Sequence, residues 1–354
     1  MEQVSFGPQI ELSKDTVLSL TYVGNWGRKE NRVRNLNQGS IIGSGAGGCP
    51  IVTFPWANLN SVTQVTTTLN PDGSCGLGGQ HGYLEYATND GNTNYNALQV
   101  DLRRTFARGL AYGVNYTWSH GLANYVDNLT GPQLPQNGLN YSAEMSNSQI
   151  DIENRFVTYA LWQLPFGKGR QWLSDGGVAS KLAGNWQFNT IFTAQTGTPF
   201  YITAPDRSYT ITGGNNSPYA NCIGNPFSGA TDTATGSGGY VGTGSGFFIN
   251  PAAFAIPANG TFGSCAPRAF HGPGLWDLDL SFFREFPVTE SKRFEFRVEF
   301  FNTFNHPNFA NPTGDITNPG SCCKVFSTIQ PILGLGSGGP GDPREIQFGL
   351  KFYF

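Results

Sequence analysis

The chain has 354 residues, of which 13% are charged, and its formal net charge is −3. The charged fraction is about half the roughly 25% of ordinary soluble domains. Without a basic excess, the composition argues against nucleic acid as a partner, and without an apolar run of about 18 residues it argues against a membrane-spanning helix.

Alternation of apolar and polar side chains predicts nine β-strands. Successive side chains on a strand point to opposite faces, so Leu98 and Val100 lie opposite Gln99 and Asp101. Most of these segments reach the roughly 9–11 residues that a tilted strand needs to cross a bilayer. In chain order the predicted strands cover residues 3–12, 15–24, 94–107, 109–120, 152–165, 184–197, 275–286, 291–304 and 346–354.

The connections between these strands alternate between short and long. Long loops without helical periodicity argue against a compact soluble domain. They are typical of an outer-membrane barrel, which has short periplasmic turns and long extracellular loops. The turns near 13–14, 107–109 and 287–290 are short, 166–183 is intermediate, and 25–93, 121–151, 198–274 and 305–345 are long.

The strand over 291–304 has one phenylalanine-rich face and one charged face. In a soluble sandwich the apolar faces meet in a core, whereas in a large barrel they face lipid and the charged faces line the lumen. Strand length, loop asymmetry and the phenylalanine at 354 favour the barrel. We therefore expect an all-β fold, an antiparallel up-and-down transmembrane β-barrel of which this chain supplies about nine strands. The convex, lipid-facing side would carry Phe294, Phe296, Val298 and Phe300, and the concave side Arg293, Glu295, Arg297 and Glu299.

Several segments together resemble the C-terminal part of a TonB-dependent outer-membrane receptor of the Oar-like kind. They are TYVGNWGR, NYNALQVDLRRTFARGL, RFVTYALWQLPFGKGR, GNWQFNTIFTAQTGTPF, FRVEFFNTFNHPNFANP and GDPREIQFGLKFYF, and the resemblance covers nearly the whole chain. It implies transport of a bulky substrate across the outer membrane of a Gram-negative bacterium, driven by the inner-membrane TonB complex. The alternatives are a surface adhesin or structural outer-membrane protein that transports nothing, and a soluble extracellular β-sandwich.

Such receptors resemble a 22-stranded barrel with a plug inside it. The sequence offers about nine strands, and no plug, regulatory domain or TonB-contacting segment. We expect residues 1–354 to be the C-terminal part of such a barrel, without the plug and the N-terminal strands. The TonB complex would then act only through the missing N-terminal part.

The last segment, QFGLKFYF, resembles the signal by which outer-membrane proteins are assembled. Gln347, Gly349, Phe352 and Phe354 fall at the positions of that signal. The resemblance implies that the barrel-assembly machinery reads this strand, and that the strand then faces outer-membrane lipid.

All six cysteines fall in predicted outer loops, two in each of three loops. An even count placed in this way indicates disulfides in an oxidising compartment. Zinc would want C-x₂₋₄-C pairs, which the wide or adjacent spacings do not provide, and free thiols remain an alternative. Adjacent Cys322 and Cys323 are awkward partners because disulfide geometry is specific. The expected pairs are Cys49–Cys75 and Cys222–Cys265.

No motif in the sequence carries enzymatic chemistry. GLGSGG at 334–339 matches a phosphate-binding pattern but is followed by PGDP rather than by a helix. Asp277 and Asp279 lie on one strand face among other charges, which favours lumen lining over acid–base catalysis. The sequence thus predicts no enzyme, no cofactor, no metal ligands and no assignable substrate residues. The four histidines, interpreted as scattered polar residues, are His81, His120, His271 and His306.

Overall fold

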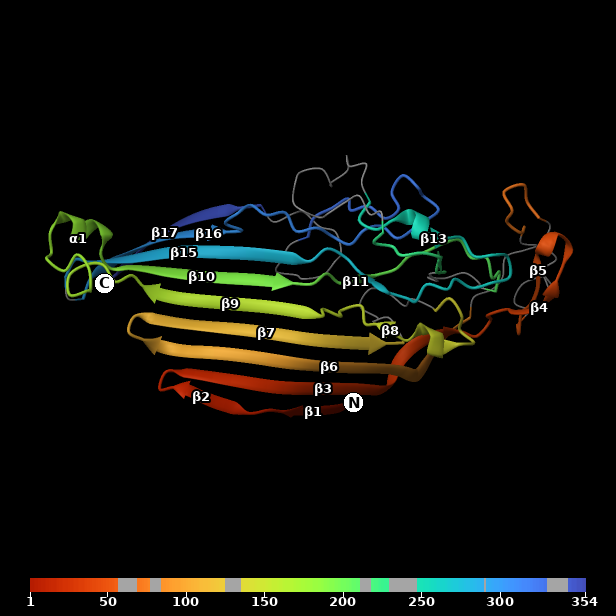
Figure 1. Ribbon diagram of the computed structural model, residues 1–354, viewed down its shortest axis with the longest axis horizontal. Helices are drawn as coiled ribbons and strands as arrows, with labels where there is room; N and C mark the ends of the chain where they lie inside the picture. Colours follow the sequence, from red (N-terminus) through yellow and green to blue (C-terminus); the bar gives the residue numbers. More distant parts are fainter. Residues whose placement is uncertain are drawn as a thin grey trace.

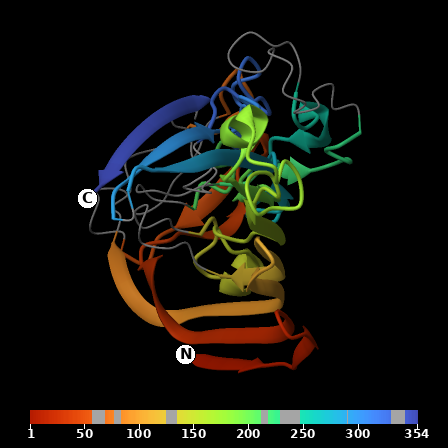
Figure 2. The same ribbon diagram turned by 90° about the vertical axis from the view of Figure 1, so that its left-hand side faces the viewer.

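A computed structural model describes the chain over residues 1–56, 69–76, 84–124, 135–210, 218–228, 247–289, 291–329 and 343–354. Its main feature is one curved antiparallel sheet whose long strands lie side by side (Figure 1). The short turns gather at one end of these strands, called here the short-turn end, and the long loops gather at the other, the outer-loop end. The view along the strands shows the sheet curving from the N-terminal strands to the C-terminal strand (Figure 2).

The strands follow one another in the sheet in chain order, as the sequence predicts. All neighbouring pairs are antiparallel, and β2 (Gln9–Ser13) and β8 (Ser146–Asn147) add short segments beside β3 and β7. Within the described residues the order across the sheet is β1 (Glu2–Phe6), β3 (Thr16–Asn35), β6 (Glu85–Ala107), β7 (Leu110–Ala123), β9 (Asn154–Gln163), β10 (Trp186–Gln195), β15 (Leu275–Pro287), β16 (Arg293–Phe301) and β17 (Glu345–Tyr353).

The first predicted strand is divided into β1 and β2 at Gly7 and Pro8. Proline has no N–H to donate to a sheet ladder. A side chain on Gly7 would lie 1.7 Å from the Leu20 carbonyl oxygen, so the backbones approach too closely there for any other residue. Both halves still pair with β3, so the predicted segment is a single edge strand of the sheet with a break at Gly7 and Pro8.

The predicted loop over 25–93 is partly wrong, because β3 and β6 run far into it. Their ladder continues from Trp26↔Asn94 to Asn35↔Glu85, with irregular register around Lys29, whose φ is 58°. The extension GRKENRVRN is polar on both faces, so no apolar alternation marks it. Backbone pairing alone continues these two strands beyond the part that has an apolar face.

The connections at the short-turn end are compact. Arg108 and Gly109, with φ of 53° and 84°, form the two-residue hairpin that joins β6 to β7; positive φ at both positions is what such a turn requires. The connection after β9 contains α1 (Val178–Ala183). In the described part of the chain, no helix has the length and apolar character needed to cross a membrane.

The register of the sheet places apolar side chains in continuous rows on one face, called here the apolar face. The other face, the polar face, carries rows of polar and charged side chains, so the predicted separation of the phenylalanines and charges of β16 is confirmed. One row of the apolar face comprises Leu110, Trp162, Phe188, Phe282, Val298 and Phe348. The next row, on the polar face, comprises Leu161, Asn189, Ser281, Glu299 and Gln347.

One arginine of β15 shares the apolar face with these residues. Arg284 lies between Trp186 and Phe296 in the register, near the short-turn end. Its guanidinium donates hydrogen bonds to the carbonyl oxygens of Lys181 and Leu182 at the end of α1. The side chain thus places its charged group beside polar atoms at the margin of the apolar face. Long cationic side chains do the same at membrane boundaries.

The described parts of the long loops fold into a packed layer, which corrects the expectation that these loops lack structure. Short paired segments stabilise it: β4 (Ser40–Ser44) with β5 (Pro50–Thr53), β11 (Pro199–Phe200) with β14 (Phe270–His271), and β12 (Asn221–Cys222) with β13 (Phe254–Ala255). Three single turns accompany them: η1 (Ala46–Gly48), η4 (Tyr141–Glu144) and η5 (Pro251–Ala253). The largest buried apolar cluster of the described residues lies in this layer rather than on the sheet, and includes Phe200, Ile202, Tyr219, Ile249 and Phe254.

Candidate functional site

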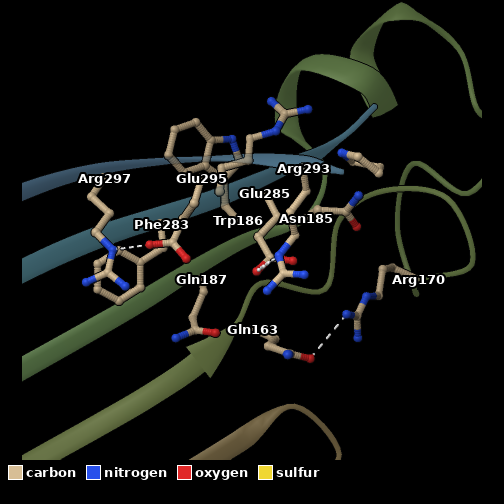
Figure 3. Close-up of a pocket in the computed structure, with 12 residues that line it drawn as sticks. Gln163, Arg170, Asn185, Trp186, Gln187, Phe283, Glu285, Arg293, Glu295 and Arg297 are labelled. Carbon is tan, nitrogen blue, oxygen red and sulfur yellow. Dashed lines mark hydrogen bonds and ion pairs between the residues drawn. The ribbon is translucent and has the colours of Figure 1, made fainter. Parts of the chain in front are cut away.

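The polar face forms a hollow of about 490 Å³ at the short-turn end (Figure 3). Four adjacent strands, β9, β10, β15 and β16, contribute side chains that line it. The polar side chains reach it because each strand presents every second residue to this face. Trp186 and Arg284, which the register assigns to the apolar face, also line the hollow. Among the residues that line the hollow are Gln163, Gln187, Glu285, Glu295 and Arg297.

Charged side chains bind one another across this hollow. Arg297 donates through Nε to Glu295, and the Tyr353 hydroxyl donates to the other oxygen of the same carboxylate at 3.1 Å. Arg293 Nε lies 3.2 Å from Glu285 Oε1, and its guanidinium stacks 4.3 Å from the Tyr353 ring. The network links β15, β16 and β17 on the polar face, and it gives that face fixed charges of both signs.

Asp277 and Asp279 lie on the same polar face of β15, as the sequence predicts. Asp277 faces Thr193 of β10 in the register. Asp279 accepts a hydrogen bond from the backbone N–H of Asn302 at 3.0 Å, just beyond the end of β16. Their positions on this face, in register with Thr193 and beside Asn302, fit a lining role on a polar surface.

Arg268 joins the packed outer-loop layer to the outer-loop end of β7. It is 2% exposed, and its guanidinium donates to the Tyr201 hydroxyl at 2.6 Å, the Ala123 carbonyl at 3.2 Å and the Ser146 hydroxyl at 3.1 Å. A buried arginine is stable only when its donors are satisfied in this way. Sequence reasoning missed this residue because a single arginine in a glycine-rich loop has no periodic signal.

Glu144 is a second buried charged residue in the same layer. The Tyr219 hydroxyl donates to its carboxylate at 2.7 Å. Burial raises the pKa of Glu144 above its ordinary value, and the hydrogen bond from Tyr219 opposes that shift in part. Tyr219 stacks on Tyr201, with ring centroids 6.0 Å apart, so Glu144 and Arg268 belong to one buried polar cluster.

The four residues of the predicted assembly signal lie along β17 and just after it. Gln347 and Gly349 are on the polar face, opposite Glu299 and Arg297. Phe352 is on the apolar face opposite Phe294, and Phe354 stacks on Phe352 while remaining 93% exposed. Recognition of this strand by the assembly machinery stays a prediction.

The cysteines lie next to one another in pairs in the outer-loop layer. Cys49 and Cys75 are bonded with Cα atoms 5.8 Å apart, and Cys222 and Cys265 are bonded with Cα atoms 4.9 Å apart. The structure also joins Cys322 to Cys323, which the sequence leaves undecided. The oxidation state in the cell stays a prediction, which mass spectrometry of the exported protein tests.

The histidines are less scattered than the sequence indicates. His306 stacks on Trp276 with ring centroids 4.0 Å apart, and burial lowers the pKa of His306. His120 and His271 both approach Asp151 at the outer-loop end. His81 and the GLGSGG segment at 334–339 lie outside the described residues.

Comparison with known proteins identifies a family model that matches nearly the whole sequence. A family model described as an outer membrane beta barrel domain matches residues 1–347, whereas no curated protein matches significantly. The solved outer membrane transporter YddB from Escherichia coli aligns with 99% of this chain at 8% identity and a TM-score of 0.45. The ferric-catecholate import receptor Fiu from Escherichia coli K12, in its closed form, aligns with 99% at 12% identity and a TM-score of 0.35. The chain covers 32% and 34% of these two proteins, about a third of each.

Proposed function

We propose, from the premise that this chain belongs to the outer membrane β-barrel family, that it forms part of the wall of a TonB-dependent transporter. The chain is a protein of the bacterial outer membrane. In this proposal it belongs to the Oar-like receptors, moves a bulky substrate across the membrane, and has no enzymatic activity of its own.

The polar face of the sheet is the observation that carries the proposal. A barrel of about eight strands has an interior that its own side chains fill. Here the polar face has a hollow of about 490 Å³ bordered by paired charges, which suits a hydrated lumen. Wide barrels with polar interiors are those that pass or enclose large solutes.

The direction of the strands supports a barrel with more strands than this chain supplies. Along the nine-strand path of the described residues, β1 and β17 occupy the first and last positions and therefore run parallel. An antiparallel barrel cannot close by pairing them directly, and unpaired edges are costly in lipid. Additional strands between β1 and β17 would close the wall, and the proposed transporter would also have a plug with a TonB-contacting segment.

A non-transporting adhesin is the second candidate. The packed outer-loop layer, joined by disulfides and by Arg268, would present a fixed surface to a partner outside the cell. Such a protein would need the same lipid-facing wall and the same assembly machinery. It would not need energy from the inner membrane.

Energy dependence separates the two candidates. We would compare a strain lacking this gene, a strain lacking TonB and the parent on a panel of large nutrients that exceed the porin limit. Transport predicts that both mutants lose growth on the same nutrient, and that a plasmid copy restores it only in the first. A defect in surface attachment, with growth unchanged on every nutrient, would contradict transport and favour adhesion.

A further inference from the structure

Two histidines and two carboxylates meet where the outer loops join the sheet. His120 lies near the outer end of β7, Asp151 and Glu153 lie just before β9, and His271 belongs to β14. Ligand atoms of His120, Asp151 and Glu153 all lie within 4.8 Å of one another. His271 Nε2 is 3.3 Å from Asp151 Oδ2, and His120 Nδ1 is 3.5 Å from the same oxygen.

Asp151 is the buried centre of this cluster. Its side chain is 0% exposed, and its Oδ1 accepts a hydrogen bond from the Gly121 N–H at 2.6 Å. A buried carboxylate is costly unless it is paired with a charge or binds a metal. Among the described residues, neither lysine nor arginine forms an ion pair with Asp151; the side chains that contact its Oδ2 there are the two imidazoles.

We propose that His120, Asp151 and Glu153, joined by His271 from beside Asp151, bind a divalent first-row transition-metal ion. Zn²⁺ is the ion used to test the proposal. Zinc binds imidazole nitrogen and carboxylate oxygen at about 2.0–2.2 Å, so the donors of a tetrahedral site lie about 3.3–3.5 Å apart. The distances from Asp151 Oδ2 to the two histidine nitrogens, 3.3 and 3.5 Å, match that spacing. A set of ligands that combines imidazole nitrogen with carboxylate oxygen suits zinc and other first-row transition metals.

The position of the cluster indicates what the ion would do. The side chains of His120 and His271 are 42% and 21% exposed, so an ion in solution can reach them. His120, Asp151 and Glu153 already lie within 4.8 Å of one another, and His271, in contact with Asp151, would complete a four-ligand site of the kind typical of structural rather than catalytic zinc. The ion would fasten the loop that contains β14 to the ends of β7 and β9, at the base of the outer-loop layer.

Titration of the protein with Zn²⁺ tests this proposal. The whole protein, isolated from outer membranes in detergent and stripped with a chelator, would be titrated with zinc chloride by calorimetry. We expect one ion per chain, and at least a tenfold weaker affinity in His120→Ala and in His271→Ala, because even indirect partners of a metal typically change affinity 10–100-fold. His306→Ala is the matched control, since His306 stacks on Trp276 outside the cluster.

Two further measurements keep the result interpretable. Substitution of Co²⁺ should give the intense visible absorption of a tetrahedral site in the native protein and lose it in His271→Ala. Circular dichroism would show whether His120→Ala is folded. If it is not, His120→Gln replaces it, because glutamine retains a polar side chain of similar length. Absence of stoichiometric zinc binding in the native protein, or unchanged binding in both histidine variants, would overturn the proposal and leave a hydrogen-bonded cluster.

Discussion

At the residue scale, adjacent side chains on one strand meet different surroundings. Leu280 of β15 lies between Thr190 and Phe300 on the apolar face. The next residue, Ser281, lies on the polar face beside Glu299. Because the backbone and the depth are nearly the same for both, this pair isolates the effect of the face.

The same substitution at these two positions should have different costs. Leu280 lies midway along β15 between Trp276 and Arg284, so an arginine there would face lipid near the membrane centre. We expect Leu280→Arg to lower the free energy of unfolding by about 2–4 kcal/mol, as charges do on the lipid face at that depth. Ser281→Arg should cost far less, because it faces a polar surface and Glu299.

Equilibrium refolding of the full protein into lipid vesicles measures both costs. Equal losses of unfolding free energy at the two positions would show that the two faces are not exposed to different solvents. A larger loss at Ser281 would reverse their assignment.

The buried carboxyl of Glu144 predicts a pH dependence in the outer-loop layer. Its pKa in the folded protein is raised above the ordinary value of 4.5, so the folded state favours the protonated form. The stabilisation is therefore complete below about pH 4.5, and it is lost as the pH rises through the raised pKa. Hydrogen exchange of residues 218–228 and 247–274, corrected for intrinsic rates, should show protection falling with pH over that window.

Glu144→Gln provides the control for this prediction. The amide keeps an acceptor for the Tyr219 hydroxyl and removes the titrating group. Protection of the outer-loop layer should then lose this pH dependence. If the variant and the native protein show the same fall, another group is responsible.

At the scale of elements, strands that have an apolar face could be predicted from sequence, and polar ones could not. The alternation that identifies β16 and β17 arises because the two faces meet different solvents. The outer parts of β3 and β6, over Arg28–Asn35 and Glu85–Asn92, are largely polar on both faces, so their sequence shows no alternation of apolar and polar residues. Their pairing depends on the partner strand, which a single segment does not reveal.

The candidate sites were harder to predict than the strands for a related reason. His271 and Asp151 are 120 residues apart in the sequence and meet only because the outer loops fold back onto β7 and β9. Arg268 likewise reaches residues of β7 and β8. The cysteines could be assigned to loops because each pair falls within one connection between strands.

The strand β17 carries a prediction about assembly rather than stability. Burying a phenylalanine contributes about 1.5–3 kcal/mol, but Phe354 is 93% exposed beside the last strand. If Phe354 is read by the assembly machinery, Phe354→Ala should reduce the amount of protein in the outer membrane and leave refolding in detergent nearly unchanged. Phe348→Ala is the control, because Phe348 lies on the same face of β17 and is not among the signal positions.

Outer-membrane abundance and refolding yield would be measured together for both variants. A parallel loss of both quantities in Phe354→Ala would mean that the residue contributes only packing. Unchanged abundance would show that the signal interpretation is wrong.

At the scale of the whole molecule, the apolar core and the apolar face are separate. The largest buried cluster lies in the outer-loop layer, whereas the rows of phenylalanine and leucine on the sheet remain uncovered, with Phe348 and Leu350 70% and 69% exposed. A soluble sandwich would bury those rows against a second sheet. The arrangement instead fits a wall that has lipid on one side and a polar lumen on the other.

Solvent accessibility along β15 in a membrane tests this account most directly. A genetically encoded nitroxide, which leaves the native cysteines in place, would be introduced at one position at a time in the whole protein in lipid vesicles. Collision rates with lipid-soluble oxygen and with a water-soluble nickel chelate would then be measured at each position. The account predicts strict alternation, with oxygen contact at Trp276, Leu278, Leu280 and Phe282 and nickel contact at Asp277, Asp279, Ser281 and Phe283. Apolar positions shielded from both reagents, as inside a sandwich, or the reverse alternation, would contradict it.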